Sequence, residues 1–178
     1  MKNLEIYIHI PFCVRKCEYC DFLSFPADDD AKLRYVKGLM AEMIFYGPLM
    51  KNYQVSSVYI GGGTPSSIDE QWIAALMEAV PDCFNVLPDA EISIECNPGT
   101  LSREKLLAYM DAGINRLSIG LQSANNDELK LLGRIHTFEQ FVTNYEVARN
   151  VGFKNINVDL MYGLPGQSAS QYMATVNK

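Results

Sequence analysis

In "AGINRLSIGLQ", residues 112–122 of this chain of 178 residues, a helix end, a turn and a strand follow one another. Gly113 stands where a helix ends, and after a short turn apolar and polar residues alternate up to Gln122, which indicates a β-strand. The stretch "VGFKNINVDLM" (151–161) repeats the same order of helix-ending glycine, turn and strand. Repeated units of this kind predict strands that alternate with helices, and therefore a parallel sheet.

The same alternation runs along the whole chain. Short segments rich in Ile, Val and Leu predict strands over residues 4–10, 56–61, 91–95, 115–120 and 155–160. Helical patterns lie between them, over residues 30–46, 69–80, 102–111 and 137–150, with a further helix beginning near 168. Thr100 or Ser102 is expected to cap the third helix, and Gly152, like Gly113, to end one.

The predicted strands carry aliphatic residues on one face and polar residues on the other. In the fourth strand this alternation sets three aliphatic side chains against three small or polar positions, namely Leu117, Ile119 and Leu121 against Ser118, Gly120 and Gln122. A parallel sheet with helices on both sides is apolar on both faces, and a complete barrel fills its interior with aliphatic residues. We therefore expect helices on the aliphatic face only, and a curved lumen for a polar ligand on the other. A solvated face of an antiparallel sheet is the alternative.

Composition restricts the class of protein. With 48% hydrophobic and 20% charged residues, the chain is typical of one soluble globular domain. The net charge of −6 argues against a nucleic-acid surface. No apolar run approaches the length of a membrane span, and the start "MKNLEIYIHIPF" does not resemble a signal peptide. We expect a cytoplasmic protein, in which clustered cysteines serve as metal ligands or redox groups rather than disulfides.

Three of the five cysteines fall within "CVRKCEYC" (13–20), directly after the first predicted strand. Cys13, Cys17 and Cys20 have the spacing C-x3-C-x2-C, which lets one short loop supply three corners of a [4Fe–4S] cluster. A zinc site is the alternative, and it would need a fourth ligand from elsewhere in the chain. Cys83 and Cys96 are interpreted as small core residues.

Further polar groups follow the other strands. "YIGGGTPSS" (59–67) is either a glycine turn or a place where backbone approaches a ligand closely. Glu95 should face the lumen at the end of the third strand, and a buried carboxylate there needs a cationic or hydroxyl partner. Gln122 and Asp159 occupy matching ends of the next two strands, and Arg134 lies in "LGRIH" (132–136). We expect these groups to meet at one rim.

The cysteine loop resembles that of the radical S-adenosylmethionine (SAM) superfamily. The resemblance implies that one iron without a protein ligand chelates the amino and carboxylate groups of SAM. Electron transfer from the reduced cluster then breaks a C–S bond and gives a 5′-deoxyadenosyl radical. A fourth cysteine would saturate that iron, so the cofactors carry the difficult chemistry and the protein orients them.

The resemblance narrows to the oxygen-independent coproporphyrinogen III oxidase group of this superfamily. It rests on seven motifs, "YIHIPFC", "YCDF", "GGGTPS", "IECNP", "LSIGLQS", "LGRIH" and "VDLMYGLPGQ". It implies a three-quarter (β/α)6 barrel of TIM type, here cut to about five βα units, within a radical SAM core domain over residues 1–178. By these motifs, the residues expected to contact SAM are Tyr7, Gly62, Gly63, Thr64 and Glu95. Those expected to contact SAM or a second SAM are Tyr19, Gln122, Arg134 and Asp159.

Two branches of that group differ in function. The oxidases are dehydrogenases that convert two propionates of coproporphyrinogen III to vinyls in haem biosynthesis, and their motif carries a further cysteine where this chain has Phe22. This difference, with "LGRIH", favours the other branch, which resembles haem chaperones. The dehydrogenase, an oxidoreductase, is the alternative.

The chaperone branch implies haem as the ligand and haem-receiving respiratory proteins as partners, with peripheral membrane contact through those clients. Haem ligation by His9 or His136 is a further possibility, although hydrogen bonding beneath the loop suits His9 better. The resemblance also implies a sixth strand and a C-terminal domain beyond Lys178. A sheet cut at this point would leave an unpaired edge that favours self-association.

Overall fold

The computed structural model describes all residues from 1 to 178. Five strands were found: β1 (Lys2–Ile10), β2 (Tyr53–Gly62), β3 (Val86–Cys96), β4 (Arg116–Gln122) and β5 (Asn155–Leu160). The α-helices are α1 (Asp29–Tyr46), α2 (Glu70–Cys83), α3 (Arg103–Asp111), α4 (Asn126–Leu131), α5 (Phe138–Val151) and α6 (Ala169–Val176). Short 3-10 helices are η1 (Gly47–Met50), η2 (Pro65–Ser67) and η3 (Pro98–Thr100).

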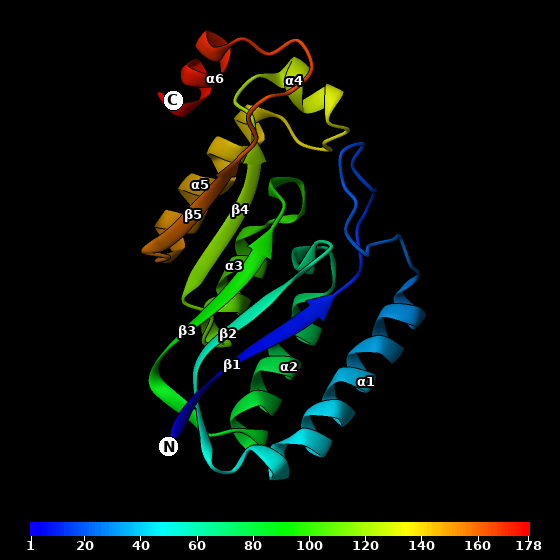
Figure 1. The fold of residues 1–178 in the computed structure, drawn as a ribbon, viewed down its shortest axis with the longest axis vertical. Coiled ribbons are helices and arrows are strands. Elements are labelled where there is room, and N and C mark those ends of the chain that lie inside the picture. The colour runs from blue at the N-terminus through cyan, green and yellow to red at the C-terminus, as the bar shows by residue number, and fades with distance from the viewer.

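The strands form one parallel sheet whose spatial order, β1-β2-β3-β4-β5, follows the sequence. A doubly wound sheet reverses its strand order at a switch point, whereas the wall of a βα barrel does not. The sheet therefore has barrel-type topology, but it is open, with β1 and β5 at its two edges (Figure 1). The predicted α/β fold with parallel strands is confirmed.

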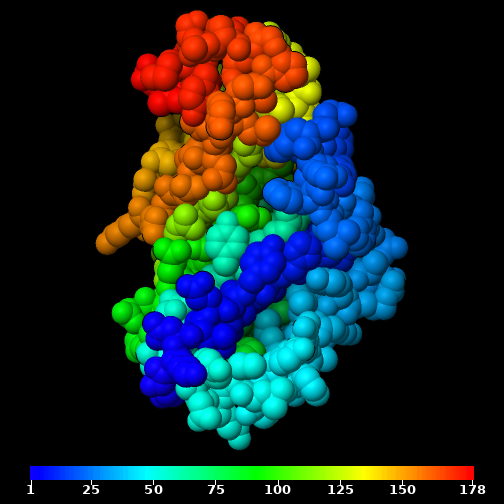
Figure 2. All heavy atoms as spheres, viewed as in Figure 1, coloured from blue at the N-terminus to red at the C-terminus, as the bar shows by residue number.

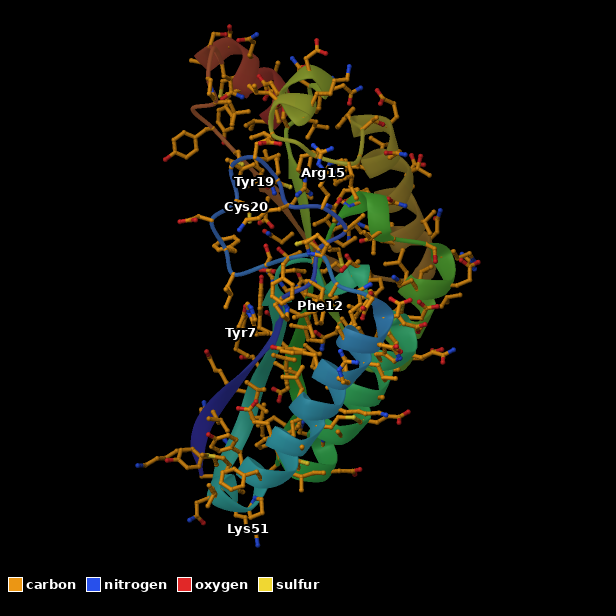
Figure 3. All side chains as sticks on the ribbon, turned by 90° about the vertical axis from the view of Figure 1, so that its right-hand side faces the viewer. Tyr7, Phe12, Arg15, Tyr19, Cys20 and Lys51 are labelled. Atoms are coloured by element: carbon orange, nitrogen blue, oxygen red, sulfur yellow. The ribbon has the colours of Figure 1, made fainter.

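Helices cover only one face of the sheet. α1 packs on α2, α2 on α3, and α3 on α5, so that they form one layer (Figures 1 and 3). The core lies between this layer and the aliphatic faces of the strands, and Ile10, Ile60, Ile94, Leu117 and Ile119 are fully buried there. None of the helices combines the length and the apolar character needed to traverse a lipid bilayer.

Local signals explain where the helices begin. Asp28 caps α1 by accepting a hydrogen bond from the Ala31 N–H at 2.7 Å, and Ser102, the second of the two expected residues, caps α3. Thr137 caps α5 within a capping box shared with Gln140. At the other end of α5, Gly152 has a φ of 127°, which L-residues rarely adopt.

The structure differs from the expected elements in two places. β3 begins at Val86, five residues before the predicted strand, and its pairing with β2 skips from Val86 to Glu91. Pro88 lies in the skipped part, where a residue without an N–H cannot join the ladder. Sequence reasoning missed α4, a helix of six residues that is too short to show a periodic pattern.

We predict that Ile119→Ala lowers the free energy of unfolding by about 2–5 kcal/mol, because it leaves a cavity beneath a central strand. Urea denaturation followed by circular dichroism measures this change. Ile156→Ala, the same change on the edge strand at a partly buried position, is the matched control and should cost clearly less. Equal losses in the two variants would contradict the fuller burial of Ile119.

Candidate functional site

A pocket lies at the carboxyl ends of the strands, on the face that carries no helices. It encloses about 720 Å³, part of it open to solvent. In Figure 2 the blue loop that follows β1 and the orange β5 stand on either side of this hollow. The lining residues are Cys13, Arg15, Cys17, Tyr19, Cys20, Phe22, Gly62, Gly63, Thr64, Glu95, Cys96, Asn97, Ser118, Gly120, Gln122, Arg134 and Asp159. Every predicted site residue except Tyr7 is among them.

The three clustered cysteines are free thiols, each half-buried in the wall of this pocket. Cys13 Sγ lies 3.4 Å from Thr64 Oγ1, Cys20 Sγ lies 4.0 Å from Ser24 Oγ, and Arg134 Nη1 donates to Cys17 Sγ at 3.6 Å. No three His, Cys, Asp or Glu side chains converge closely enough to enclose a single metal ion. All three thiols lie in the wall of the same pocket.

Backbone hydrogen bonds hold the cysteine loop at both ends. The Cys13 N–H donates to Phe25 O at 3.2 Å, and the Phe25 N–H donates to Pro11 O at 2.9 Å. Across the pocket, the Glu18 N–H donates to Leu132 O at 3.1 Å. Figure 3 shows Tyr19 and Cys20 on this loop, above Phe12 at its base. The path of the loop is thus set largely by main-chain contacts.

Arg134 connects the loop to β4. Its Nη2 donates to Gly120 O at 2.6 Å, while Nη1 also donates to Tyr19 Oη at 3.4 Å. Burial raises the pKa of Tyr19, and the Arg134 guanidinium partly opposes that effect. Arg134 therefore ties both Tyr19 and Cys17 of the loop to β4.

The glycine turn after β2 lies directly against the cysteine loop. The Gly63 N–H donates to Ile10 O and the Thr64 N–H to Phe12 O, both at 2.8 Å. A Cβ on Gly63 would lie 2.8 Å from Phe12 O and 3.0 Å from Cys13 Sγ. Only glycine allows so close an approach, so this turn shapes the wall around the thiols.

Glu95 accepts two hydrogen bonds on the floor of the pocket. The Tyr59 hydroxyl donates to Oε1 at 2.8 Å, and the Gly62 N–H donates to Oε2 at 3.0 Å. The partner is therefore a hydroxyl, one of the two kinds expected, and no cation pairs with this carboxylate. Burial and the neighbouring carboxylate raise the pKa of Tyr59, so the phenol stays neutral and remains a donor.

β4 and β5 end with the remaining polar groups. Asp159 accepts hydrogen bonds from the Ser118 hydroxyl at 3.1 Å and from the Asn157 amide at 2.7 Å. Gln122 is the only non-glycine residue with a positive φ, 71°, and it lies where the β4–β5 register shifts. Such irregularities re-aim side chains near ligand sites, at the cost of local strain.

Tyr7 lies outside the pocket, although it is on the open face, where Figure 3 shows it. Its hydroxyl is 3.1 Å from His9 Nδ1, and its ring stacks on Tyr59 with the centroids 6.2 Å apart. Tyr59 in turn holds Glu95. The expected role of Tyr7 as a direct SAM contact stays a prediction.

Six further lining residues were not assigned to the site from the sequence, namely Arg15, Phe22, Cys96, Asn97, Ser118 and Gly120. Strand alternation had placed Ser118 and Gly120 on the polar face, so the signal was present for those two. Cys96 lies at the end of β3, where burial raises the pKa of its thiol strongly. A buried thiol of this kind is a poor metal ligand, in agreement with the predicted core role.

The fold and this site define a class: an open βα-barrel wall with a cysteine-lined ligand pocket at the carboxyl ends of its strands. Over residues 7–178 the sequence matches the radical SAM superfamily. It is 39% identical over 172 residues to the haem chaperone HemW of Bacillus subtilis, covering 96% of this chain and 45% of that protein. It is 38% identical over 181 residues to HemW of Escherichia coli, covering 98% and 47%. The chain belongs to the radical SAM superfamily.

Solved structures agree with this assignment. Coproporphyrinogen III oxidase (HemN) from Escherichia coli, described as a radical SAM enzyme, matches with a TM-score of 0.90 at 33% identity, over 99% of this chain and 41% of that one. Methylornithine synthase (PylB) matches with a TM-score of 0.65 at 13% identity, which shows the fold alone. The chain spans a little under half the length of these relatives.

The residues of the pocket fit the cofactors that the family implies, a [4Fe–4S] cluster and SAM. Three free thiols surround an open space, and one of them lies beside an arginine. The adjacent glycine turn leaves no Cβ between the loop and the pocket. When bound, the cluster would supply an electron to SAM; Cys13, Cys17 and Cys20 would hold the cluster, and the glycine turn would let SAM lie close beside it.

We predict that Gln122→Gly raises the free energy of unfolding by about 0.5–1 kcal/mol, because glycine adopts a positive φ without strain. Urea denaturation of the purified protein measures the change. Gln122→Asn, which tolerates this conformation while keeping an amide, should be nearly neutral. A clear loss of stability in the glycine variant would mean that the glutamine side chain contributes more than the strain costs.

Proposed function

We propose that this protein is a radical SAM haem chaperone that binds a [4Fe–4S] cluster and SAM and delivers haem. The observation that carries the cofactor part is the gathering of Cys13, Cys17 and Cys20 around one pocket without a fourth protein ligand. Three cysteines spaced C-x3-C-x2-C on one loop suit three corners of a [4Fe–4S] cluster, whereas a structural zinc site would need a fourth ligand. The radical SAM core domain spans residues 1–178 in this proposal.

The SAM contacts follow from the placement of the polar groups. Gly62, Gly63, Thr64 and Glu95 border the cysteine loop from β2 and β3, and they would hold SAM next to the cluster. Tyr7 would act from the rim of the same face. Tyr19, Gln122, Arg134 and Asp159 line the other side of the pocket, and they would bind SAM or a second SAM.

The hypothesis that the protein is a haem chaperone rests on two observations. The relatives named above that share 38–39% identity are haem chaperones. At the position of the additional cysteine of the oxidases, Phe22 lines the pocket while remaining 69% exposed. An exposed aromatic ring offers a flat porphyrin a stacking surface and no thiol chemistry.

Coproporphyrinogen III dehydrogenase is the second candidate function. The observation in its favour is the TM-score of 0.90 to the oxidase HemN.

Haem or a porphyrinogen is therefore the proposed ligand class, with haem-receiving respiratory proteins as partners and membrane contact only through them. A reducing, cytoplasmic compartment is proposed because there clustered thiols remain available as metal ligands.

We predict that anaerobic reconstitution of the full-length protein gives about four irons and four sulfides per chain, with broad absorption at about 400 nm. Cys17→Ala should lose most of this iron, because the cluster loses one of its three ligands. Cys83→Ala is the matched control, since Cys83 lies at the end of α2, outside the pocket, and it should retain the cluster. Stoichiometric zinc without sulfide would contradict the proposal.

Two assays on the full-length protein distinguish the haem-chaperone hypothesis from the dehydrogenase hypothesis. Haem titration should give a saturable complex. Anaerobic incubation with coproporphyrinogen III, SAM and a reductant should leave the porphyrinogen unchanged, as judged by chromatography. Formation of protoporphyrinogen, or failure to bind haem, would overturn the chaperone proposal, and the first result would establish the dehydrogenase instead.

A further inference from the structure

Asn97 lies one residue beyond β3 and lines the pocket, although it is only 8% exposed. Its backbone N–H donates to Ser66 Oγ at 3.0 Å, and its carbonyl oxygen accepts from the Thr100 N–H at 2.9 Å. The main chain at this position is therefore fixed between the turn after β2 and the short helix η3.

Two donors determine which way the Asn97 side-chain amide is turned. The Gly99 N–H donates to Oδ1 at 3.2 Å, and His136 Nδ1 lies 3.2 Å from the same oxygen. A backbone N–H cannot accept a hydrogen bond, so the atom that faces Gly99 must be the oxygen. The His136 nitrogen beside that oxygen must then carry the proton.

The amide nitrogen Nδ2 of Asn97 is left without a protein acceptor. Gly99 and His136, the two groups that hold the side chain, both contact Oδ1. Nδ2 has no hydrogen bond to the protein, and it is not sealed from solvent. Because the residue is otherwise buried and lines the pocket, the remaining accessible donor faces the pocket. A fixed amide with two free hydrogens is suited to an oxygen acceptor on a ligand.

His136 is buried, neutral and in hydrogen-bond contact with the Asn97 amide. The ring is 3% exposed, and burial, with the nearby Arg134 charge, lowers its pKa to about 4, so it is neutral near pH 7. Its Nε2 is buried without a partner. An apolar side chain of similar size would fill the space without leaving a buried acceptor unpaired. The donor from Nδ1 to Asn97 is an interaction that such an apolar side chain could not supply.

We propose that Asn97 is a ligand-binding residue that donates from Nδ2 to a carboxylate or hydroxyl oxygen of SAM, and that His136 is the positioning residue that orients it. The inference rests on the proposed function, because it takes SAM as the ligand of this pocket. It adds a donor from the end of β3 to the groups supplied by the glycine turn and by Glu95.

The test titrates SAM into the anaerobic, cluster-loaded, full-length protein. Asn97→Ala should raise the Kd for SAM about tenfold, and Asn97→Asp should raise it further because it places an acceptor opposite an acceptor. Asn85→Ala, on the exposed loop before β3, is the control and should not change the Kd. If the wild type binds SAM and the Asn97 variants bind equally well, the inference is wrong and the proposed function stands. If the wild type does not bind SAM, both fall.

The positioning role is tested with a double-mutant cycle. His136→Leu should weaken SAM binding by a similar factor in the wild type but have no further effect on Asn97→Ala. His136→Asn, whose amide can supply a donor close to Nδ1, should restore most of the affinity. Iron content and thermal unfolding check that each variant is folded and loaded. Additive effects, or no rescue by asparagine, would mean that His136 only packs.

Two fragments of SAM identify the oxygen. Methionine carries the carboxylate and 5′-deoxyadenosine carries the ribose hydroxyls, so Asn97→Ala should weaken the binding of one and leave the other unchanged. Equal binding of both fragments by the variant and the wild type would overturn the inference.

Discussion

The structure depends on the unequal faces of its parallel strands. Burial of Ile94, Leu117 and Ile119 against the helices supplies the hydrophobic stabilisation, so the sheet needs cover on that side only. The other face keeps Glu95, Ser118 and Asp159. The two carboxylates, Glu95 and Asp159, both have hydrogen-bond partners within the sheet, which removes most of the desolvation cost of burying them there. A polar lumen is therefore compatible with a stable fold.

The site combines groups held with very different rigidity. Glu95 and Asp159 stand on strands, and Asn97 is held by its own backbone and by two donors to its side chain. The cysteines stand on a loop that crosses to β4 through Arg134. The groups on the strands are therefore placed more rigidly than the thiols on the loop.

Much of the fold could be predicted from the sequence because its signals are local. The alternation of aliphatic and polar residues predicted which face of each strand is buried, and Gly152 and Ser102 predicted where helices end and begin. The positive φ of Gln122 could not be predicted, because glutamine carries no signal for it. Contacts between distant segments were also hidden: Arg134 reaches Cys17 across 117 residues, and His136 reaches Asn97 across 39. For the site, the residues named by the resemblance line the pocket with the exception of Tyr7, and their roles stay predictions, whereas Asn97 is distinguished only by its burial and hydrogen bonding.

The anchoring of the cysteine loop has a consequence for how its sequence can vary. Main-chain groups at Cys13, Glu18 and Phe25 fix the path, so the identities of intervening side chains such as Val14 and Lys16 matter little to it. The number of residues between the anchors matters much more, because one added or lost residue would rotate every thiol after it. The number of residues in the loop, rather than the identity of its intervening side chains, therefore sets the positions of the thiols. Substitutions in the loop should be tolerated where insertions and deletions are not.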